Sequence, residues 1–306
     1  MLRTKLLPTF NAIPASGSAG TATVDLPVGL MYHAVWLRVG YDATNGTNPN
    51  EKYTGNSAAN QIIGDIRVKI NGKTQRIFSA KQLNALNSAY DSACALITTG
   101  TAGSSGYREF IPIYFAEPWR KDVREQELSA WNVVGVRSFQ IEVDLKALTS
   151  PVLGGFYEFE PGDTSRDIGT IVKHFRQTFA AAGTAIDINT LDRRDRLQAI
   201  HLFATSDGKY VDNVKLTANG VELRDVAMDY LDNYASLKAR GMNPNITANS
   251  TTNYLGPQFD VVMDYNDALA ANLLLNGLDE LTLRTEFSAA ASGTIDALIE
   301  RAGPPE

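Results

Sequence analysis

Three histidines are the residues in this chain best suited to proton transfer or to metal binding. His33 and His201 fall within predicted strands beside apolar neighbours, and His174 lies between Lys173 and Phe175 in another. Catalysis needs a constellation of partner groups around such a residue, and a metal site needs clustered His and Glu ligands. No such motif accompanies any of the three. We therefore interpret them as hydrogen-bonded strand histidines.

Two glycine-containing segments superficially resemble nucleotide-binding motifs. Gly72-Lys73-Thr74 has the ending of a phosphate loop, but that motif needs glycine where Arg67 stands. Gly100, Gly103 and Gly106 lack the strand–loop–helix context of a dinucleotide fingerprint. The G-x-S-x-G nucleophile elbow is absent as well. We predict no catalytic residue, no cofactor-binding residue and no enzymatic activity.

Carboxylates are the remaining candidates for metal ligands. Asp260, Asp264 and Asp267 cluster near one predicted strand, and Asp163 and Asp167 lie in a polar linker. Calcium takes several such oxygens, but the EF-hand spacing is absent. Solvated acidic loop residues are the favoured interpretation, so the metal ligands, if there are any, stay unknown.

Cysteine usage and charge exclude further classes. Cys94 is the only cysteine, which excludes an internal disulfide framework, and no basic group near it in the sequence would activate the thiol. The basic run Arg193–Arg196 is interrupted by acids, which favours a salt-bridged turn over a nucleic-acid contact. A net charge of −6 agrees with this and predicts no sequence-specific nucleic-acid partner. The N-terminus lacks a secretory apolar stretch, so we expect synthesis in a cytoplasm.

The elements that would position these residues are mostly short strands separated by turns. The alternating segment 65–70 is followed by Asn71-Gly72, a strong hairpin signal. Ser79 and Gln82 then form a capping box for a helix. The first half is predicted to hold strands near 5–12, 20–26, 33–40, 63–70, 73–78, 109–116, 136–145 and 152–160. Thr98–Gly106 is predicted as a loop, and Pro112 favours a sheet edge or a bulge.

The second half repeats this order. Its predicted strands are 172–180, 184–189, 197–204, 214–218, 221–224, 259–263, 278–287 and 294–300. The hairpin signal recurs at Asn219-Gly220, and Asp225 is predicted to cap a second helix carrying Ala227, Leu231, Tyr234 and Leu237. Between equivalent positions the numbering offset is 165 at Trp36 and His201, 148 at the two hairpins, and 142 at Phe156 and Leu298. One polar insertion, 41–61, explains the main change of offset and supports a tandem duplication.

Eight strands in two packed sheets form a jelly roll, which limits open sheet edges. We therefore predict an all-β double jelly roll, with residues 1–161 in the first, residues 162–306 in the second, and one short helix between the fifth and sixth strands of each. Charge divides unevenly between the halves. Residues 1–161 hold 15 basic and 14 acidic residues (net +1), whereas residues 162–306 hold 13 and 20 (net −7).

Five segments carry a resemblance to a known family: Phe10–Pro14, Val24–Gly29, Ile66–Gly72 with its helix, Phe115–Trp119 and Leu197–His201. In order and spacing the chain resembles the double jelly-roll major capsid proteins of tailless icosahedral phages with an internal membrane, and is most similar to those of the corticoviruses. The resemblance covers nearly the whole chain, and the duplicated order is its main evidence. Segments 41–61 and 243–256 depart from the family's pattern.

The resemblance implies a structural subunit of a virion capsid. Such a subunit forms pseudo-hexameric homotrimers and an icosahedral shell with vertex and minor capsid proteins around an internal membrane. It also leaves structural calcium between domains or subunits as an open alternative. We expect Arg3 and Lys5 to lie on the membrane side, and the loops 41–61 and 243–256 to lie together at the outer end.

Two other function classes were weighed against the capsid subunit. A carbohydrate- or receptor-binding β-sandwich would use exposed aromatics such as Tyr41, Tyr53 and Tyr254. A cupin-type or other β-rich hydrolase would need clustered His and Glu ligands, which are missing. The carbohydrate- or receptor-binding alternative does not explain two fused jelly rolls with a helix at the same place in each.

Overall fold

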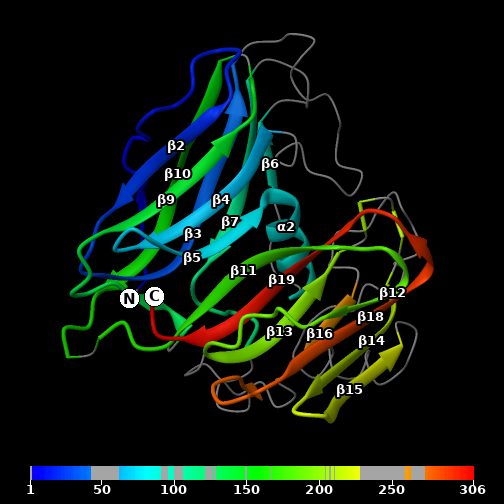
Figure 1. Cartoon of the computed structure of the whole chain (residues 1–306). Coiled ribbons are helices and arrows are strands. Elements are labelled where there is room, and N and C mark those ends of the chain that lie inside the picture. Colours follow the sequence, from blue (N-terminus) through cyan, green and yellow to red (C-terminus); the bar gives the residue numbers. More distant parts are fainter. Residues whose placement is uncertain are drawn as a thin grey trace.

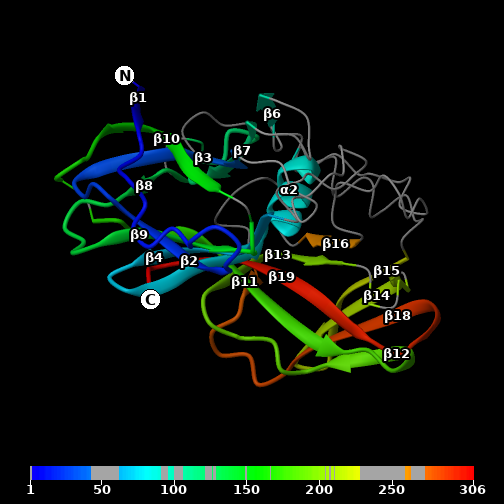
Figure 2. The same ribbon diagram turned by 90° about the horizontal axis from the view of Figure 1, so that it is seen from above.

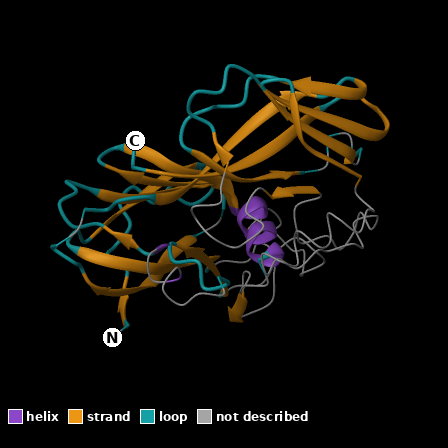
Figure 3. Ribbon diagram, turned by 90° about the horizontal axis from the view of Figure 1, so that it is seen from below, coloured by secondary structure: helices purple, strands orange, loops and turns teal. Residues whose placement is uncertain are grey.

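The computed structural model describes residues 2–42, 62–90, 96–99, 106–120, 126, 129–148, 150–165, 167–203, 205–206, 208–209, 211–227, 259–262 and 273–306. Strands dominate these parts, as Figure 3 shows. The first half contains β1 (Arg3–Leu6), β2 (Gly20–Leu26), β3 (Leu30–Tyr41), β4 (Ile63–Ile70), β5 (Lys73–Ser79), α2 (Ala80–Ala89), β6 (Leu96–Thr99), β7 (Tyr107–Tyr114), β8 (Trp131–Asn132), β9 (Phe139–Leu145) and β10 (Pro151–Pro161).

The second half contains a matching series of strands (Figure 1). These are β11 (Ile171–Ala180), β12 (Gly183–Ile188), β13 (Arg196–Leu202), β14 (Val211–Ala218), β15 (Val221–Ala227), β16 (Phe259–Val262), β17 (Leu273–Leu274), β18 (Leu281–Ala291) and β19 (Thr294–Gly303). All sixteen predicted strands have a counterpart here, which confirms the strand order read from the sequence.

The strands form three sheets within the described residues. One has the order β1-β10-β3-β7-β6, one β16-β13-β19-β11-β5-β4-β9-β2, and one β12-β18-β14-β15. If the eight strands predicted for each half are numbered in turn, both halves pair as 1-8-3-6 and 2-7-4-5, which is the jelly-roll order. Figure 2 shows the first half in two layers, with β1, β10, β3 and β7 lying over β2, β9 and β4.

The strand registers confirm the duplication residue by residue. Trp36 pairs with Phe156 in the first half, and His201 pairs with Leu298 in the second, at the offsets of 165 and 142 read from the sequence. Both ladders are interrupted at the equivalent place, between Glu158 and Phe159 in one and between Leu197 and Ala199 in the other. A shared irregularity at an equivalent position is difficult to reconcile with a chance likeness, because bulges are specific features of a strand pair.

The two hairpins have the same geometry. Asn71 and Gly72 have φ of 53° and 80°, and Asn219 and Gly220 have φ of 47° and 75°. Two successive positive φ values are the conformation that Asn-Gly adopts in a two-residue hairpin. Each Asn side chain also accepts hydrogen bonds from two backbone N–H groups that precede the seventh strand of its half. The donors are Arg137 and Ser138 (2.7 and 3.3 Å) for the first and Asp279 and Glu280 (both 2.9 Å) for the second.

The predicted capping box at the start of α2 is present. The backbone N–H of Gln82 donates to Ser79 Oγ at 3.2 Å, and that of Ser79 donates to Gln82 Oε1 at 3.0 Å. Two N–H groups that the helix leaves free are therefore satisfied. The side chain of Asn87 donates to the Pro112 carbonyl oxygen at 3.0 Å. Pro112 stays paired with Trp36 of β3, and its other side lies beyond the last β6 pair, Leu96–Phe110, so β7 has an edge at this residue among the described residues, as predicted.

Several local predictions are wrong. Asp225 does not begin a helix, because the hairpin continues through it and pairs it with Lys215; β15 ends only at Ala227. The remainder of the predicted second helix lies outside the described residues. The predicted loop 98–106 contains the end of β6, which pairs with the edge of β7. The strand predicted near 5–12 is limited to β1 and an isolated Asn11–Thr23 bridge.

Buried hydrophobic side chains form two clusters. One lies mainly in residues 10–171 and includes the aromatic rings of Tyr32, Phe115, Trp131 and Phe139. The other lies within residues 181–299. Ala199 and Leu298 belong to the first cluster although they lie in the second half, so the halves share apolar surface. Among the described residues, no helix has the length and apolar character needed to cross a membrane.

Candidate functional site at the junction of the two halves

The two halves meet where β5 runs parallel to β11, with Arg76 opposite His174. Arg76 is only 2% exposed. Its Nε donates to the Val172 carbonyl oxygen at 2.8 Å, and its Nη1 donates to that of Tyr114. The guanidinium also lies over the Trp131 ring, 4.7 Å from its centroid. Arg76 therefore joins the halves by hydrogen bonds to backbone oxygens on both sides.

A single buried carboxylate gathers three side chains beside Arg76. Glu300 Oε2 accepts a hydrogen bond from Tyr90 Oη at 2.8 Å, and the Nε2 atoms of His201 and His174 lie 3.3 and 3.5 Å from it. Tyr90 comes from the end of α2, whereas the other three residues come from the second half. The sheet brings them together because β11, β19 and β13 are neighbours and present these side chains on one face.

Burial controls the charge of this cluster. Burial and, to a smaller extent, the nearby Arg76 charge together lower the pKa of His174 to about 4, against the opposing effect of Glu300. Burial likewise lowers the pKa of Arg76 to about 10, against the opposing charges of Glu117 and Glu300. At neutral pH, Arg76 is therefore charged and His174 is neutral.

These contacts agree with the interpretation of His174 and His201 as hydrogen-bonded strand residues. His33 lies elsewhere, on β3, with Nε2 3.7 Å from Glu160 Oε2. No group of three or more His, Cys, Asp or Glu side chains is arranged to hold a metal ion in the described parts of the chain. The junction cluster thus has the chemistry of a structural polar network.

The partly buried rim of the junction adds direct contacts between the halves. Arg176 on β11 makes two hydrogen bonds to the Asp65 carboxylate on β4, at 2.7 and 2.8 Å. The side chain of Gln82 in α2 donates to Asp296 Oδ2 at 3.3 Å. The bidentate geometry fixes orientation as well as distance.

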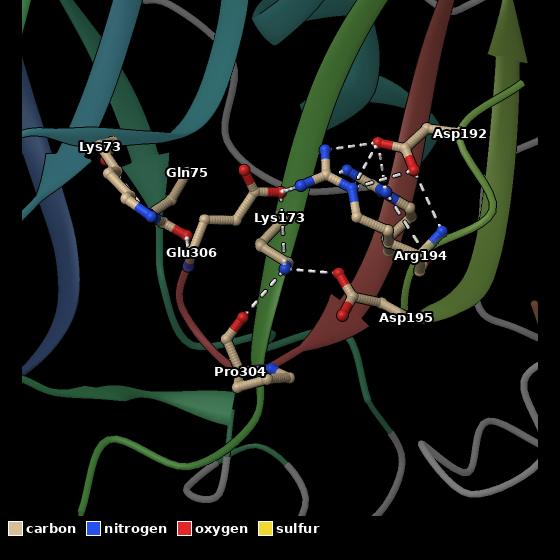
Figure 4. Close-up of polar contacts among 9 residues, drawn as sticks. Lys73, Gln75, Lys173, Asp192, Arg194, Asp195, Pro304 and Glu306 are labelled. Carbon is tan, nitrogen blue, oxygen red and sulfur yellow. Dashed lines mark hydrogen bonds and ion pairs between the residues drawn. The ribbon is translucent and has the colours of Figure 1, made fainter. Parts of the chain in front are cut away.

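A second charged cluster ties residues 304–306 across the same junction (Figure 4). The Glu306 N–H donates to Gln75 Oε1 on β5 at 3.0 Å, and Lys173 Nζ donates to the Pro304 carbonyl oxygen at 2.9 Å. Lys173 is 1% exposed and is also paired with Asp195. Residues from both halves therefore converge on the last residues of the second half.

The basic run 193–196 takes part in this second cluster. Arg194 pairs with Asp192 and with Glu306 (2.6 and 3.1 Å), and the buried Arg301 pairs with Asp192 at 2.9 Å. Burial raises the pKa of Asp192, but the hydrogen bonds from Arg194 and the charge of Arg301 outweigh it and lower the pKa to about 2. The prediction of a salt-bridged turn is confirmed.

Other predicted candidates are dispersed. Gly72-Lys73-Thr74 lies in the β4–β5 hairpin, and Asp260 lies in β16 opposite His201. Asp163 Oδ1 accepts hydrogen bonds from the Ser165 N–H and Oγ, as in a local turn, and Asp167 is exposed. Cys94, Asp264, Asp267, Tyr53, Tyr254, residues 43–61 of the first long loop and all of 243–256 lie outside the described residues.

The structure corrects one candidate of the carbohydrate-binding alternative. Tyr41 is fully buried and stacks on Tyr107, with ring centroids 5.4 Å apart. It points into the first core because β3 extends to this residue and pairs it with Tyr107 on β7. An exposed sugar-stacking role for Tyr41 is therefore excluded by its burial.

Sequence reasoning missed Arg76 and Glu300 as the centre of the junction. The offsets of 148 and 142 align them with Arg224 and Glu158 of the other half, but their burial depends on how the halves dock. Comparisons with known proteins bear on what such a pair of docked jelly rolls does. Residues 4–160 match the model of the viral coat protein P2 N-terminal domain.

The chain belongs to this viral coat protein family. Among solved structures, it is similar to the major capsid protein P2 of bacteriophage PM2, with a TM-score of 0.72 and 18% identity, over 99% of this chain and 97% of that one. It is also similar to the major capsid protein of Sulfolobus turreted icosahedral virus (TM-score 0.64, 12% identity, 100% and 97% covered) and to the PBCV-1 capsid protein (0.60, 10%, 99% and 93%). No curated protein matches the sequence.

Membership in the family settles the class of function. The chain is a viral coat protein, a structural subunit of the virion capsid rather than an enzyme, and it self-assembles into the capsid shell. The fold is the double jelly roll of the capsid proteins named above. The polar clusters at the junction therefore serve to hold the two jelly rolls in one fixed arrangement within a coat subunit.

Proposed function

We propose that this coat protein assembles as a homotrimer with a pseudo-hexameric outline. The observation that carries the proposal is the duplication, in which two jelly rolls share strand order, register and bulges. Three copies of a chain with two similar halves present six similar units around one threefold axis. Closed cyclic assemblies of this kind are common among homo-oligomers.

In each chain of the proposed trimer, the first jelly roll ends at residue 161 and the second begins at residue 162. Strand β10 ends at Pro161, and the polar segment that follows leads to β11, which begins at Ile171. Two separate clusters of buried side chains support this division. The strands would stand roughly perpendicular to the shell, and the loops 41–61 and 243–256 would lie at its outer end.

The N-terminal end of β1 would lie on the inner side, over an internal membrane. Arg3 and Lys5 are exposed on this strand. Each cation near an anionic lipid surface contributes about 1 kcal/mol, so two give weak, reversible contact. Vertex and minor capsid proteins would complete the shell, with assembly in the host cytoplasm.

The mass of the purified protein in solution tests the trimer. Three chains of 33.3 kDa predict a particle of about 100 kDa by native mass spectrometry or light scattering. A stable monomer or dimer at high concentration, without threefold contacts in imaged particles, would overturn the trimer. A trimer with residues 2–15 on the outer surface would overturn only the membrane-side assignment.

A further inference from the structure

The two halves present equivalent sheet faces whose surroundings differ. In the second half, the face of β11, β19 and β13 that carries His201, Leu298 and Glu300 is completely buried, with all three side chains 0% exposed. Tyr90, stacked on Trp119 of the first half, lies over His201 with ring centroids 6.2 Å apart. The first half therefore covers this face within the chain.

The equivalent face of the first half is less completely covered. Trp36, Phe156 and Glu158 occupy the positions of His201, Leu298 and Glu300, and all three are only half-buried. Trp36 stacks on Phe156 at 5.8 Å, and Phe110 and Tyr114 from β7 flank this pair. Leu6, opposite Phe156 on β1, is 77% exposed. We call this surface, formed by Leu6, Trp36, Phe110, Tyr114 and Phe156, the aromatic face.

The strand edges repeat the same contrast. Within the chain, β5 pairs with β11 through Arg76 and His174, and so closes one edge from each half. Their equivalents are β15 and β1, with Arg224 and Thr4 at the matching positions. Both β15 and β1 are terminal strands of their sheets among the described residues, so each has an edge to which another strand can add.

We propose that, in the trimer, the second half of one copy covers the aromatic face of the next, with β15 lying parallel to β1. The proposal rests on the proposed trimer and names the surface that forms it. The junction inside the chain is the template for this contact. Within the chain the first half covers the second half. Between copies the same arrangement recurs, with the second half of one copy covering the first half of the next. Repetition of one interface three times within chains and three times between them closes a ring of six jelly rolls.

Charge favours this occupant over a contact between like halves. Residues 1–161 carry a net charge of +1 and residues 162–306 carry −7, so two second halves would repel each other. The composition of the aromatic face also fits, because aromatic residues are enriched in the buried centre of interfaces. A hydrophobic centre between two halves of opposite net charge is the expected character of such a contact.

Engineered disulfides test the register. The template places Arg76 opposite His174, so Thr4→Cys and Arg224→Cys in one chain should lie opposite each other between copies, within the distance that a disulfide spans. Oxidised T4C/R224C protein should migrate as a covalent trimer under denaturing, non-reducing conditions. The single variants T4C and R224C report any cross-link to Cys94, and T4C/T184C, with its second cysteine on the edge strand β12, is the matched control.

The outcomes separate this proposal from that of the trimer. Cross-linking of T4C/R224C but not of T4C/T184C supports the interface. A 100 kDa trimer without the 4–224 cross-link, or with the 4–184 cross-link instead, overturns the interface and leaves the trimer standing. A stable monomer overturns both.

A second variant tests the aromatic face without new cysteines. Leu6→Glu adds a charge at a side chain that is 77% exposed in the monomer, so folding should be unaffected, while trimer dissociation should rise at least tenfold. Val28→Glu, at a residue 45% exposed in the β2–β3 turn, is the control and should leave dissociation unchanged. Equal dissociation of both variants and the parent would overturn the proposal.

Discussion

Acid should weaken the junction through His174, and the structure fixes the pH window. The ordinary pKa of histidine is 6.5, and in the folded chain burial and the Arg76 charge lower that of His174 to about 4. Between these two values the unfolded chain binds a proton at this residue and the folded chain does not. Stability from this group is therefore complete above pH 6.5 and is lost as the pH falls toward 4.

The expected size follows from the shift. One pKa unit corresponds to about 1.4 kcal/mol, so a difference of about 2.5 units removes roughly 3 kcal/mol from the free energy of unfolding across this range. The loss has a slope near 1.4 kcal/mol per pH unit and levels off below pH 4 for this group. Other acid-sensitive groups add to the total, so the contribution of His174 must be measured as a difference.

Urea unfolding of the purified protein at a fixed concentration, followed at several pH values from 7.5 to 4, provides that difference. His174→Gln keeps an amide N–H near Glu300 but cannot titrate, so its stability should fall less steeply than that of the parent by about one proton. His33→Gln is the control, because its side chain is 19% exposed on β3. Parallel pH profiles for H174Q and the parent would refute the assignment of the slope to His174.

Three further substitutions test the repeated elements and the rim. Asn71→Gly keeps the positive φ but removes the one side-chain oxygen that accepts both hydrogen bonds, and should lower the free energy of unfolding by about 1 kcal/mol in denaturant titrations; Asn219→Gly should match it, and no loss in either would contradict a stabilising role for these hydrogen bonds. Gly72→Val should cost 1 kcal/mol or more because its φ is +80°, which a β-branched residue tolerates poorly; an unchanged midpoint would show that the turn relaxes freely. Asp65→Asn should cost about 0.5–1 kcal/mol, since the Arg176 pair is partly solvated, whereas a loss above 3 kcal/mol would mean a buried pair; a double-mutant cycle with Arg176→Gln measures the coupling.

The strand order could be predicted because most strands alternate or end at strong turn signals. Residues 65–70 with Asn71-Gly72 are an example, and β4 and β2 have the predicted bounds. The numbering offsets between equivalent residues of the two halves could be read from the sequence, because an insertion in a loop does not change which residues pair within the strands. Asp225 misled the prediction because a residue that suits a helix cap also suits the exposed side of a hairpin strand.

The junction could not be predicted from local signals. Glu300 and Glu158 occupy equivalent positions, and each follows two bulky hydrophobic residues, yet Glu300 is 0% exposed and Glu158 is half-buried. What differs is the surface that covers each one, which is set by the docking of the two halves. The same holds for Arg76, whose burial results from the contact of β5 with β11.

The face around Glu300 and the aromatic face are equivalent but differ in chemistry. This difference fits the proposed trimer, in which the first is covered within the chain and the second only on assembly. The face around Glu300 is covered by the same chain, so its charges meet Arg76 and Tyr90 whenever the chain folds, and a buried carboxylate with these partners is tolerated. The aromatic face is only partly buried in the chain and, in the proposed trimer, is covered when another copy arrives. Aromatic rings suit that role because they tolerate partial exposure and gain stability when buried, whereas a buried charge would need its partner at once. Trp36 stands at the position that is equivalent to His201. An aromatic side chain there suits a face that, in the proposed trimer, is covered between chains, whereas His201 lies on a face that is covered within the chain.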